Sequence, residues 1–474
     1  MKLFARPKCL TEAVASVITL NRLMGLRVFE YPRGQPRPIL SLIYLLFLYC
    51  LYYSGSWYLE EEYYSSIKLL KLEYFLYKIL DYIVIYLIFV KLLLGWWYTK
   101  KFEACYRKIF EIDETLRQLG SAVNYDKIYF ITIGVMFFWF TFTFFTCIVV
   151  FIIMRAHSDV YRTIGAIILY TYSLAVSSII IFEFYIFAKC LQMRFEMINQ
   201  LLHESSTALS AKEIKLGFFE VQDYVKIMDI EQQKSLLPMK ILSQCCRKMQ
   251  SGKNISVSEK QNSVKSQIQS HFPSHFQKQF QGELRNRFQR HNSVMTECQK
   301  RKYLLQIIKQ VHLELCKVSK TVCIIFGVQT ASEIGVIIML LTGTVYNLYI
   351  RYIAKQHKFT NSLMQETTVT ILLSILQFLK ITFLSRVCKH AADMGNKTIE
   401  IIYSIYGCNA ASGVQEEIQQ FGIQILLSPV RFSAYGISLD NRVLTMMLKF
   451  VTTYLVIMIQ VSNSLESNKA ISNV

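Results

Sequence analysis

The chain has 474 residues, of which 53% are hydrophobic, 14% aromatic and 18% charged, and its net charge is +19. Soluble domains carry about 25% charged residues, whereas disordered, collagen-like and disulfide-scaffold chains are polar, glycine-periodic or small and rich in cysteine. The composition excludes these classes. Because the apolar residues are gathered into long uncharged runs, the sequence predicts a membrane protein.

The length of each apolar run sets the number of membrane spans. A helix needs about 20 apolar residues to cross the hydrocarbon core, where no water can satisfy a bare backbone. Four runs are uncharged over this length or nearly so, and three more contain one or more charges. We therefore predict an all-α membrane protein with seven transmembrane helices, at residues 38–59, 77–98, 128–154, 163–182, 334–350, 367–384 and 444–464.

The distribution of Lys and Arg predicts the orientation. Most of them fall on the side of the N-terminus, even when the long connection between the fourth and fifth spans is left out. The positive-inside rule then places the N-terminus in the cytoplasm and the C-terminus outside, opposite to a G-protein-coupled receptor. It also accounts for the net charge, together with anionic lipid, so nucleic acid is not an expected partner. No signal peptide is expected, because Arg22 and Arg27 interrupt the amphipathic stretch before the first span.

Several helices are expected to continue past the membrane into the cytoplasm. Residues 304–351 contain no proline, and apolar residues recur there at spacings of four and three, which is typical of a packing seam. The fourth and sixth helices also continue without a proline, and residues 413–427 predict a further helix that Pro429 ends. The sequence therefore predicts a cytoplasmic bundle through which subunits assemble. Residues 244–302 are polar, and we expect a disordered loop there, either a tolerated insertion or a regulatory segment.

No cofactor, metal site or enzyme activity is expected. The twelve cysteines form no C-x-x-C pair, and none falls in an expected extracellular loop. The motifs H-E-x-x-H, G-x-S-x-G and Walker A are missing, and no inverted repeat of broken helices is evident. An enzyme or a secondary transporter is therefore the less favoured alternative.

The last span carries a motif. Thr453 and Tyr454, five apolar residues and Gln460 form the T-Y-(apolar)5-Q signature, and the chain resembles the insect gustatory receptor family there. Residues 431–436, 439–440, 416–418, 312–316 and 326–329 also resemble that family. The resemblance implies a seven-helix, ligand-gated, non-selective cation channel that assembles as a tetramer. It also implies that the cytoplasmic ends of helices four to seven form the anchor and that the last helix lines the pore.

Side chains on the last helix fit a pore. Lys449, Thr453, Val456, Gln460 and Ser464 recur at helical spacing and form a largely polar stripe, which is costly against lipid. In a tetramer, Gln460 and Ser464 would form side-chain rings, and Ile457 and Val461 an apolar constriction that gates by dewetting. The alternative is a helix-packing seam. The family usually has Phe where this chain has Val461, and a small or apolar residue where it has Lys449.

The expected ligand site lies between the extracellular halves of the helices. In this topology aromatic and hydrogen-bonding side chains gather there, as suits a small polyhydroxylated or aromatic tastant. The alternative for the tyrosines is an interfacial aromatic belt. The candidate ligand-binding residues are Asp81, Tyr82, Tyr86, Thr342, Tyr346, Asn347, Gln365 and Thr368.

The resemblance implies a taste receptor in the plasma membrane, on dendrites of gustatory neurons, that passes monovalent and divalent cations. The pore-helix pattern is most similar to the branch with fructose-type receptors, so a sugar is the expected ligand and a bitter compound the alternative. Assembly is expected as a homotetramer or as a heteromer with related subunits. The alternative functions are a G-protein-coupled-type chemoreceptor and a ligand-binding co-receptor subunit without its own conductance.

The expected organisation has seven parts. They are a cytoplasmic N-terminal tail (1–37), transmembrane helices one to four (38–192), a cytoplasmic extension with the polar loop (193–303), the long helices five and six (304–407), an anchor helix and turn (408–442), the pore-lining helix (443–465) and an extracellular C-terminus (466–474).

Overall fold

The computed structural model describes residues 7, 9–29, 36–66, 71–155, 159–207, 297–353, 361–406 and 412–472. Two compact units are distinguished, Met1–Ser210 with Leu305–Val474, and Ala211–Leu304. Of the second unit only the first turns of one helix are described, so the expected loop at 244–302 lies almost entirely outside the described residues. The fold below is that of the first unit.

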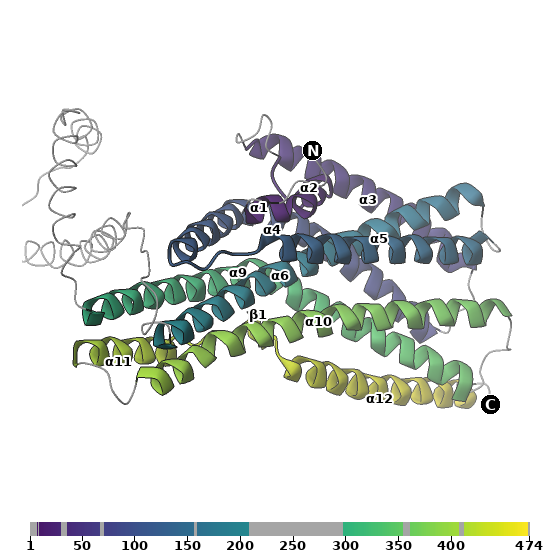
Figure 1. Ribbon diagram of the computed structural model, residues 1–474. Helices are drawn as coiled ribbons and strands as arrows, with labels where there is room; N and C mark the ends of the chain where they lie inside the picture. The colour runs from purple at the N-terminus through teal and green to yellow at the C-terminus, as the bar shows by residue number, and fades with distance from the viewer. Residues whose placement is uncertain are drawn as a thin grey trace, which may run out of the picture. The chain divides into compact units, whose positions relative to one another are not determined.

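The described residues form helices and one short hairpin (Figure 1). In chain order the elements are α1 (Leu10–Ala13), α2 (Ala15–Leu23), α3 (Pro38–Ser66), α4 (Lys71–Gln118), α5 (Tyr125–Arg155), α6 (Val160–Thr207), α9 (Glu297–Leu348), the π-helical turn η2 (Tyr349–Ile353), α10 (Asn361–Tyr406), α11 (Ser412–Leu427), β1 (Ser433–Ala434), β2 (Ile437–Ser438) and α12 (Asn441–Ser472).

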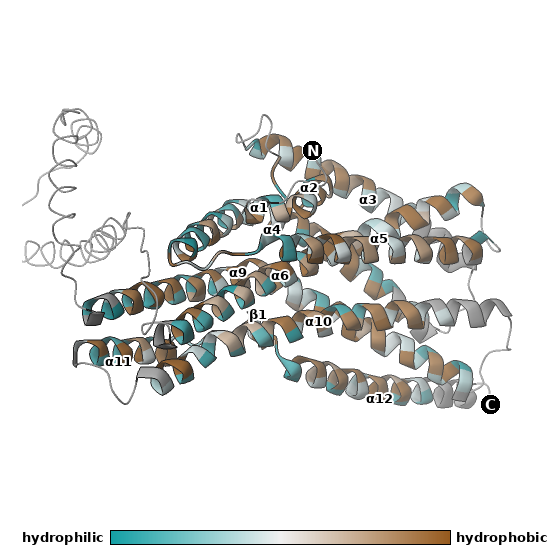
Figure 2. Cartoon of the chain, in the orientation of Figure 1, coloured by the Kyte–Doolittle hydropathy of each residue, from teal (hydrophilic) through white to brown (hydrophobic). Residues whose placement is uncertain are grey.

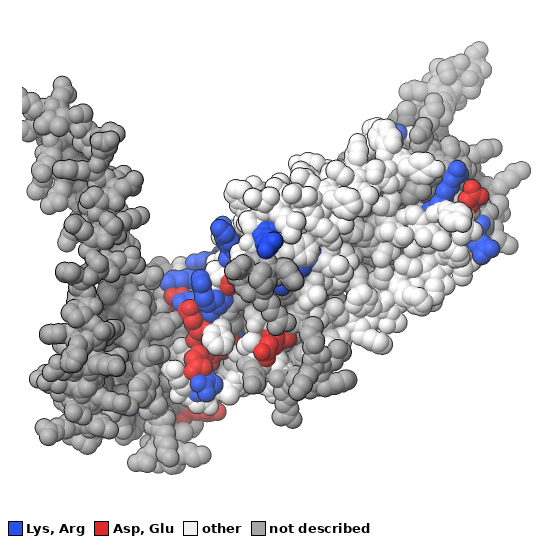
Figure 3. All heavy atoms as spheres, turned by 90° about the horizontal axis from the view of Figure 1, so that it is seen from above, with Lys and Arg blue, Asp and Glu red and all other residues white. Residues whose placement is uncertain are grey.

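Seven of these helices are long and apolar enough to cross a membrane, which confirms the predicted number. They are α3, α4, α5, α6, α9, α10 and α12. Hydrophobic residues cover most of α3 and α5 (Figure 2). On the face drawn in Figure 3, charged residues gather in two zones, and a broad uncharged surface separates them. This pattern is that of a membrane-spanning fold, whereas the orientation of the termini stays a prediction.

The second span is much longer than its apolar run. The expected span was 77–98, but α4 continues to Gln118. Its extension buries a stripe at spacings of three and four residues, formed by Phe102, Cys105, Ile109, Ile112 and Leu116. Charged residues between these positions obscure the stripe in the sequence. Therefore α4 overruns the apolar region, as the sequence predicted only for the fourth, fifth and sixth helices.

The N-terminal segment, expected as a tail, folds as α1 and α2 and is part of the core. Leu10, Val14 and Val17 are buried on one face. The chain after α2 passes so close to α4 that a Cβ at Gly95 would lie 2.4 Å from the carbonyl oxygen of Leu26. Because only glycine permits this approach, position 95 fixes the N-terminal segment against α4.

A buried ion pair joins α4 to α6. The guanidinium of Arg194 donates from Nε to Asp113 Oδ1 at 2.7 Å and from Nη2 to Oδ2 at 2.5 Å. Tyr125, on the first turn of α5, donates its hydroxyl to the same carboxylate at 2.7 Å. Because Arg194 is fully buried and Asp113 is 4% exposed, this pairing is bidentate and shielded from water.

Near the same end of the fold, α11 covers α9 and α10 (Figure 1). The ammonium of Lys309 on α9 lies 2.6 Å from the carboxylate of Glu417 on α11. The ring of His312 is buried, with Nε2 at 3.0 Å from the Gly395 carbonyl oxygen on α10. Asn199 on α6 donates to the Met394 carbonyl at 2.9 Å. These contacts tie the extended parts of α6, α9, α10 and α11 into one bundle.

Replacing Arg194 by Met is expected to lower the free energy of unfolding by about 3–5 kcal/mol, because Asp113 is then left as an uncompensated buried charge. Arg117→Met is the matched control. Arg117 pairs with Glu114 on the exposed surface of α4, the helix that also carries Asp113, and exposed pairs contribute little to stability. Thermal unfolding of the detergent-solubilised protein measures both. Equal, small shifts for the two variants would contradict the stabilising role of the buried pair.

Candidate pore helix and ligand region

The helix α12 packs on the protomer with one face only. Val443, Met447 and Val451 are buried and follow each other at four-residue spacing. A helix turns by about 100° per residue, so the stripe of Lys449, Thr453, Val456, Gln460 and Ser464 lies about 140° away from this face.

All five stripe residues are exposed in the single chain. Ile457 lies beside the stripe and is 46% exposed, whereas Val461, 18 residues after Val443, lies in line with the buried face and is 41% exposed. Except for Val461, the residues predicted to line a pore therefore lie on the face of α12 that its own protomer leaves uncovered. The packing of α12 within the protomer is made by its buried face, and the alternative for the stripe, a helix-packing seam, stays open for contacts between subunits.

A tight hairpin connects α11 to α12. Its strands pair Ser433 with Ser438 and Ala434 with Ile437. Both residues of its turn have positive φ, 48° at Tyr435 and 88° at Gly436, as a two-residue turn of type I′ requires. Glycine adopts this conformation without strain, but tyrosine does not. The side chain of Tyr435 is 81% exposed, so contacts of that side chain within the described residues do not explain the strain.

The hairpin is held against α9 and α6. Ala434 is fully buried, and a Cβ at Gly327 on α9 would lie 3.3 Å from the Tyr435 backbone nitrogen. The ring of Phe432 lies 6.4 Å from that of Phe184 on α6, which in turn stacks on Phe326 at 5.1 Å. The hairpin therefore packs directly on α9 and α6.

The first turn of α12 is capped by Asp440. Its Oδ1 accepts from the Arg442 backbone N–H at 2.7 Å, and its Oδ2 accepts from the Ser438 hydroxyl at 3.0 Å. An acidic N-cap satisfies free N–H groups and is favoured by the helix dipole. The segment 431–440, singled out by its resemblance to a family motif, is thus the docked turn that starts α12.

The candidate ligand residues fall into two groups. Thr342, Tyr346 and Asn347, on α9, are buried. Their helix turns lie beside the start of α4, because a Cβ at Gly343 would lie 3.2 Å from Leu76 Cδ2. The neighbouring Thr344 exchanges a 2.8 Å hydrogen bond with Ser374 on α10. This part of α9 therefore presents polar groups inside the helix bundle.

The candidates on α4 and α10 are placed differently. Asp81, Tyr82 and Tyr86 are exposed, Tyr86 to 64%. Thr368 is also exposed, and the side chain of Gln365 lies outside the described residues. The structure thus brings together the α9 candidates but turns the two tyrosines of α4 outward, where an aromatic belt would lie.

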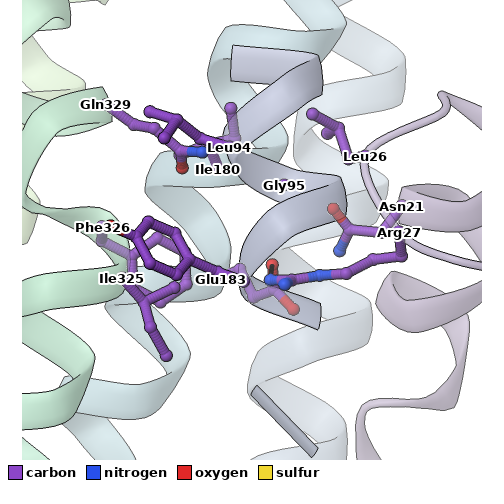
Figure 4. Close-up of a pocket in the computed structure, with 11 residues that line it drawn as sticks. Asn21, Leu26, Arg27, Leu94, Gly95, Ile180, Glu183, Ile325, Phe326 and Gln329 are labelled. Carbon is purple, nitrogen blue, oxygen red and sulfur yellow. Dashed lines mark hydrogen bonds and ion pairs between the residues drawn. The ribbon is translucent and has the colours of Figure 1, made fainter. Parts of the chain in front are cut away.

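A small cavity lies elsewhere, between α2, α4, α6 and α9 (Figure 4). Arg27 reaches Glu183 there at 2.8 Å and stacks its guanidinium 3.2 Å from the centre of the Phe102 ring. The volume of the cavity that the centre of a water molecule can occupy is about 10 Å³. This is room for about one buried water. Asn21 Oδ1, buried and without a hydrogen-bond partner among the described residues, suits such a water. The cavity is too small for a tastant.

The sequence shows the charges inside the spans but does not show which of them pair. Lys91, Glu183, Glu333 and Lys380 are isolated charges in apolar runs, and each is bonded to another helix or to the N-terminal segment. Ionisable residues inside membrane spans are expected to pair or to serve function. That rule gives a signal for their importance, but only the structure identifies Glu333 as the partner of Lys91 and Arg27 as the partner of Glu183.

The family comparison agrees with the seven-helix architecture. A family model described as "7tm Chemosensory receptor" matches residues 16–249 and 268–463. The structure of the insect olfactory receptor OR5 from Machilis hrabei, solved in complex with eugenol, has a TM-score of 0.45 and 11% sequence identity, and the match covers 95% of this chain and 98% of that chain. No curated protein matches the chain.

Gly436→Ala is expected to lower the free energy of unfolding by about 1–2 kcal/mol, because a Cβ is unfavourable at a positive φ. The position has open space around it, so the loss isolates backbone strain from steric overlap. Gly335→Ala is the control. Gly335 is an exposed residue in the middle of α9, with open space around it and ordinary helical φ. Equal melting temperatures for Gly436→Ala and wild type would contradict the turn geometry.

Proposed function

The chain belongs to the family of 7tm chemosensory receptors of insects, whose members are ligand-gated ion channels, and we propose that it is a gustatory receptor, a cation channel opened by a tastant. A sugar such as fructose is the proposed ligand. The family binds small molecules and forms oligomeric channels. For this chain we propose a homotetramer, or a heteromer with related subunits, in the plasma membrane of gustatory neurons.

One observation carries the channel proposal: α12 turns its polar stripe away from its own protomer. A polar face against lipid is costly, whereas four copies of α12 around an axis would give Thr453, Gln460 and Ser464 an aqueous path. Ile457 and Val461 would then form the apolar constriction that gates this path. Val461 is smaller than the Phe usual in the family, so the constriction is expected to be wider or displaced along the helix. Lys449, near the start of α12, is expected to extend its ammonium toward the inner interface.

The proposed ligand site uses the buried candidates on α9. Thr342, Tyr346 and Asn347 offer hydroxyl, phenol and amide groups beside an aromatic ring, the chemistry that a sugar requires. We assign the exposed Tyr82 and Tyr86 of α4 to an interfacial aromatic belt. A ligand that binds the open arrangement more tightly than the closed one would then open the channel by population shift.

Expression of the chain alone, with a panel of sugars and bitter compounds, tests the channel. We expect a ligand-evoked cation current and, in Gln460→Ala, a changed reversal potential in mixed Na⁺ and Ca²⁺ solutions, because one ring of amides has been removed. Gln419→Ala, an exposed glutamine of α11, is the control and should behave as wild type. Unchanged conduction in Gln460→Ala would refute the assigned pore face. No current despite surface expression would favour a co-receptor without its own conductance.

Two tyrosine variants test the ligand site. Tyr346→Phe is expected to raise the half-activating sugar concentration about fivefold to tenfold, the effect of losing one hydrogen bond of about 1 kcal/mol. Tyr86→Phe should leave it unchanged, because its ring stays in the belt. Dose–response curves for both variants decide the assignment, and the reverse ranking would move the ligand to the face of α4.

A further inference from the structure

A cluster of charges lies inside the membrane helices, away from the candidate pore and ligand residues. Lys91 on α4 contacts Glu333 on α9 directly, and both residues are 3% exposed. The ammonium of Lys91 also donates to the Ser177 hydroxyl on α6 at 2.9 Å. Lys91 and Glu333 therefore hold α4, α6 and α9 together through a pair shielded from water.

A second lysine lies beside this pair without a carboxylate of its own. Lys380 on α10 donates to the Ser178 hydroxyl of α6 at 3.4 Å, and it is close enough to Glu333 to interact with it electrostatically. Ser177 and Ser178 are consecutive, so both ammonium groups bind to the same turn of α6. Lys380 forms no ion pair within the described part of the chain.

Two cations compete for one anion in this cluster. In a low-dielectric interior the carboxylate strongly stabilises whichever ammonium it contacts, and the other is left with a hydroxyl alone. Such an arrangement would allow two solutions: the observed one, with Glu333 bound to Lys91, and a second one, with Glu333 bound to Lys380. Packed helices change between such discrete arrangements rather than by gradual deformation.

The cluster is mechanically connected to α12. Glu333 lies six residues after Gly327 on α9, which is about 9 Å along the helix axis. Gly327 supports the hairpin backbone at Tyr435, and this hairpin starts α12. A shift of this part of α9 from α4 toward α10 would therefore displace the surface on which the hairpin rests.

We propose that Glu333 is a two-position gating contact, which binds Lys91 in one state of the channel and Lys380 in the other. The proposal rests on the channel function proposed above. Lys91, Lys380 and Glu333 act as positioning residues, because they set the place of α9 beneath the hairpin and touch neither ions in the pore nor the ligand.

The alternative pairing predicts non-additive stabilities. In the wild-type chain Lys380→Met should change the melting temperature little, because Glu333 keeps Lys91. In a Lys91→Met background the same change removes the last cation near Glu333 and should lower the melting temperature markedly further. Lys389→Met, at an exposed position of α10, is the control in both backgrounds. If Lys380→Met shifts the melting temperature equally in both backgrounds, the alternative pairing of Glu333 with Lys380 is refuted, whether or not the chain conducts.

Dose–response curves of the single variants test the gating role. Lys91→Met and Lys380→Met should shift the half-activating ligand concentration in opposite directions, each by about fivefold or more, because each removes the partner of a different state. Lys100→Met on α4 and Lys389→Met on α10 should leave it unchanged. Shifts in the same direction, in a wild-type chain that conducts, would overturn the gating contact and leave the channel proposal standing.

Discussion

Lipid offers no hydrogen bonds, so a polar helix face inside a membrane must find protein or water. In this chain the constraint bears most on α12, which buries Val443, Met447 and Val451 against its protomer and leaves Thr453, Gln460 and Ser464 outside. Thr453 and Ser464 donate hydrogen bonds to carbonyl oxygens of their own helix, and the single protomer leaves this polar face uncovered. We propose that several copies assemble around that face and enclose a water-filled path for ions.

The rest of the fold serves to hold α12 at its N-terminal end. The hairpin at 433–438 rests on Gly327 of α9, its Phe432 ring lies near α6, and Asp440 caps the helix that follows. Beneath it, buried charges join the membrane helices at defined points. The pair of Arg194 with Asp113 is bidentate and has no competing cation within the described residues, so it stabilises one arrangement. The cluster around Glu333 has two cations, and for this reason we assign it to switching.

How much of this could be predicted depends on the kind of pattern. Seven long apolar runs give the seven spans, because hydrocarbon thickness fixes helix length. The overrun of α4 was missed, since Lys100, Lys101 and Lys108 interrupt the stripe that Phe102, Cys105 and Ile109 form.

The position of a residue along its helix can be read from the sequence, but the direction in which its side chain points depends on the neighbouring helices. This is why Tyr86 and Tyr346, both expected at the ligand, are found exposed and buried respectively. The charges in the spans were evident, whereas their partners depend on tertiary contacts.

The most direct measurement is the accessibility of single cysteines along α12 to a water-soluble, charged thiol reagent during ligand application. The account predicts that current through Thr453→Cys, Gln460→Cys and Ser464→Cys channels changes on exposure to the reagent, while Met447→Cys and Val451→Cys channels respond like wild type. Modification of the buried face with no effect at positions 453, 460 and 464 would contradict an aqueous path along α12.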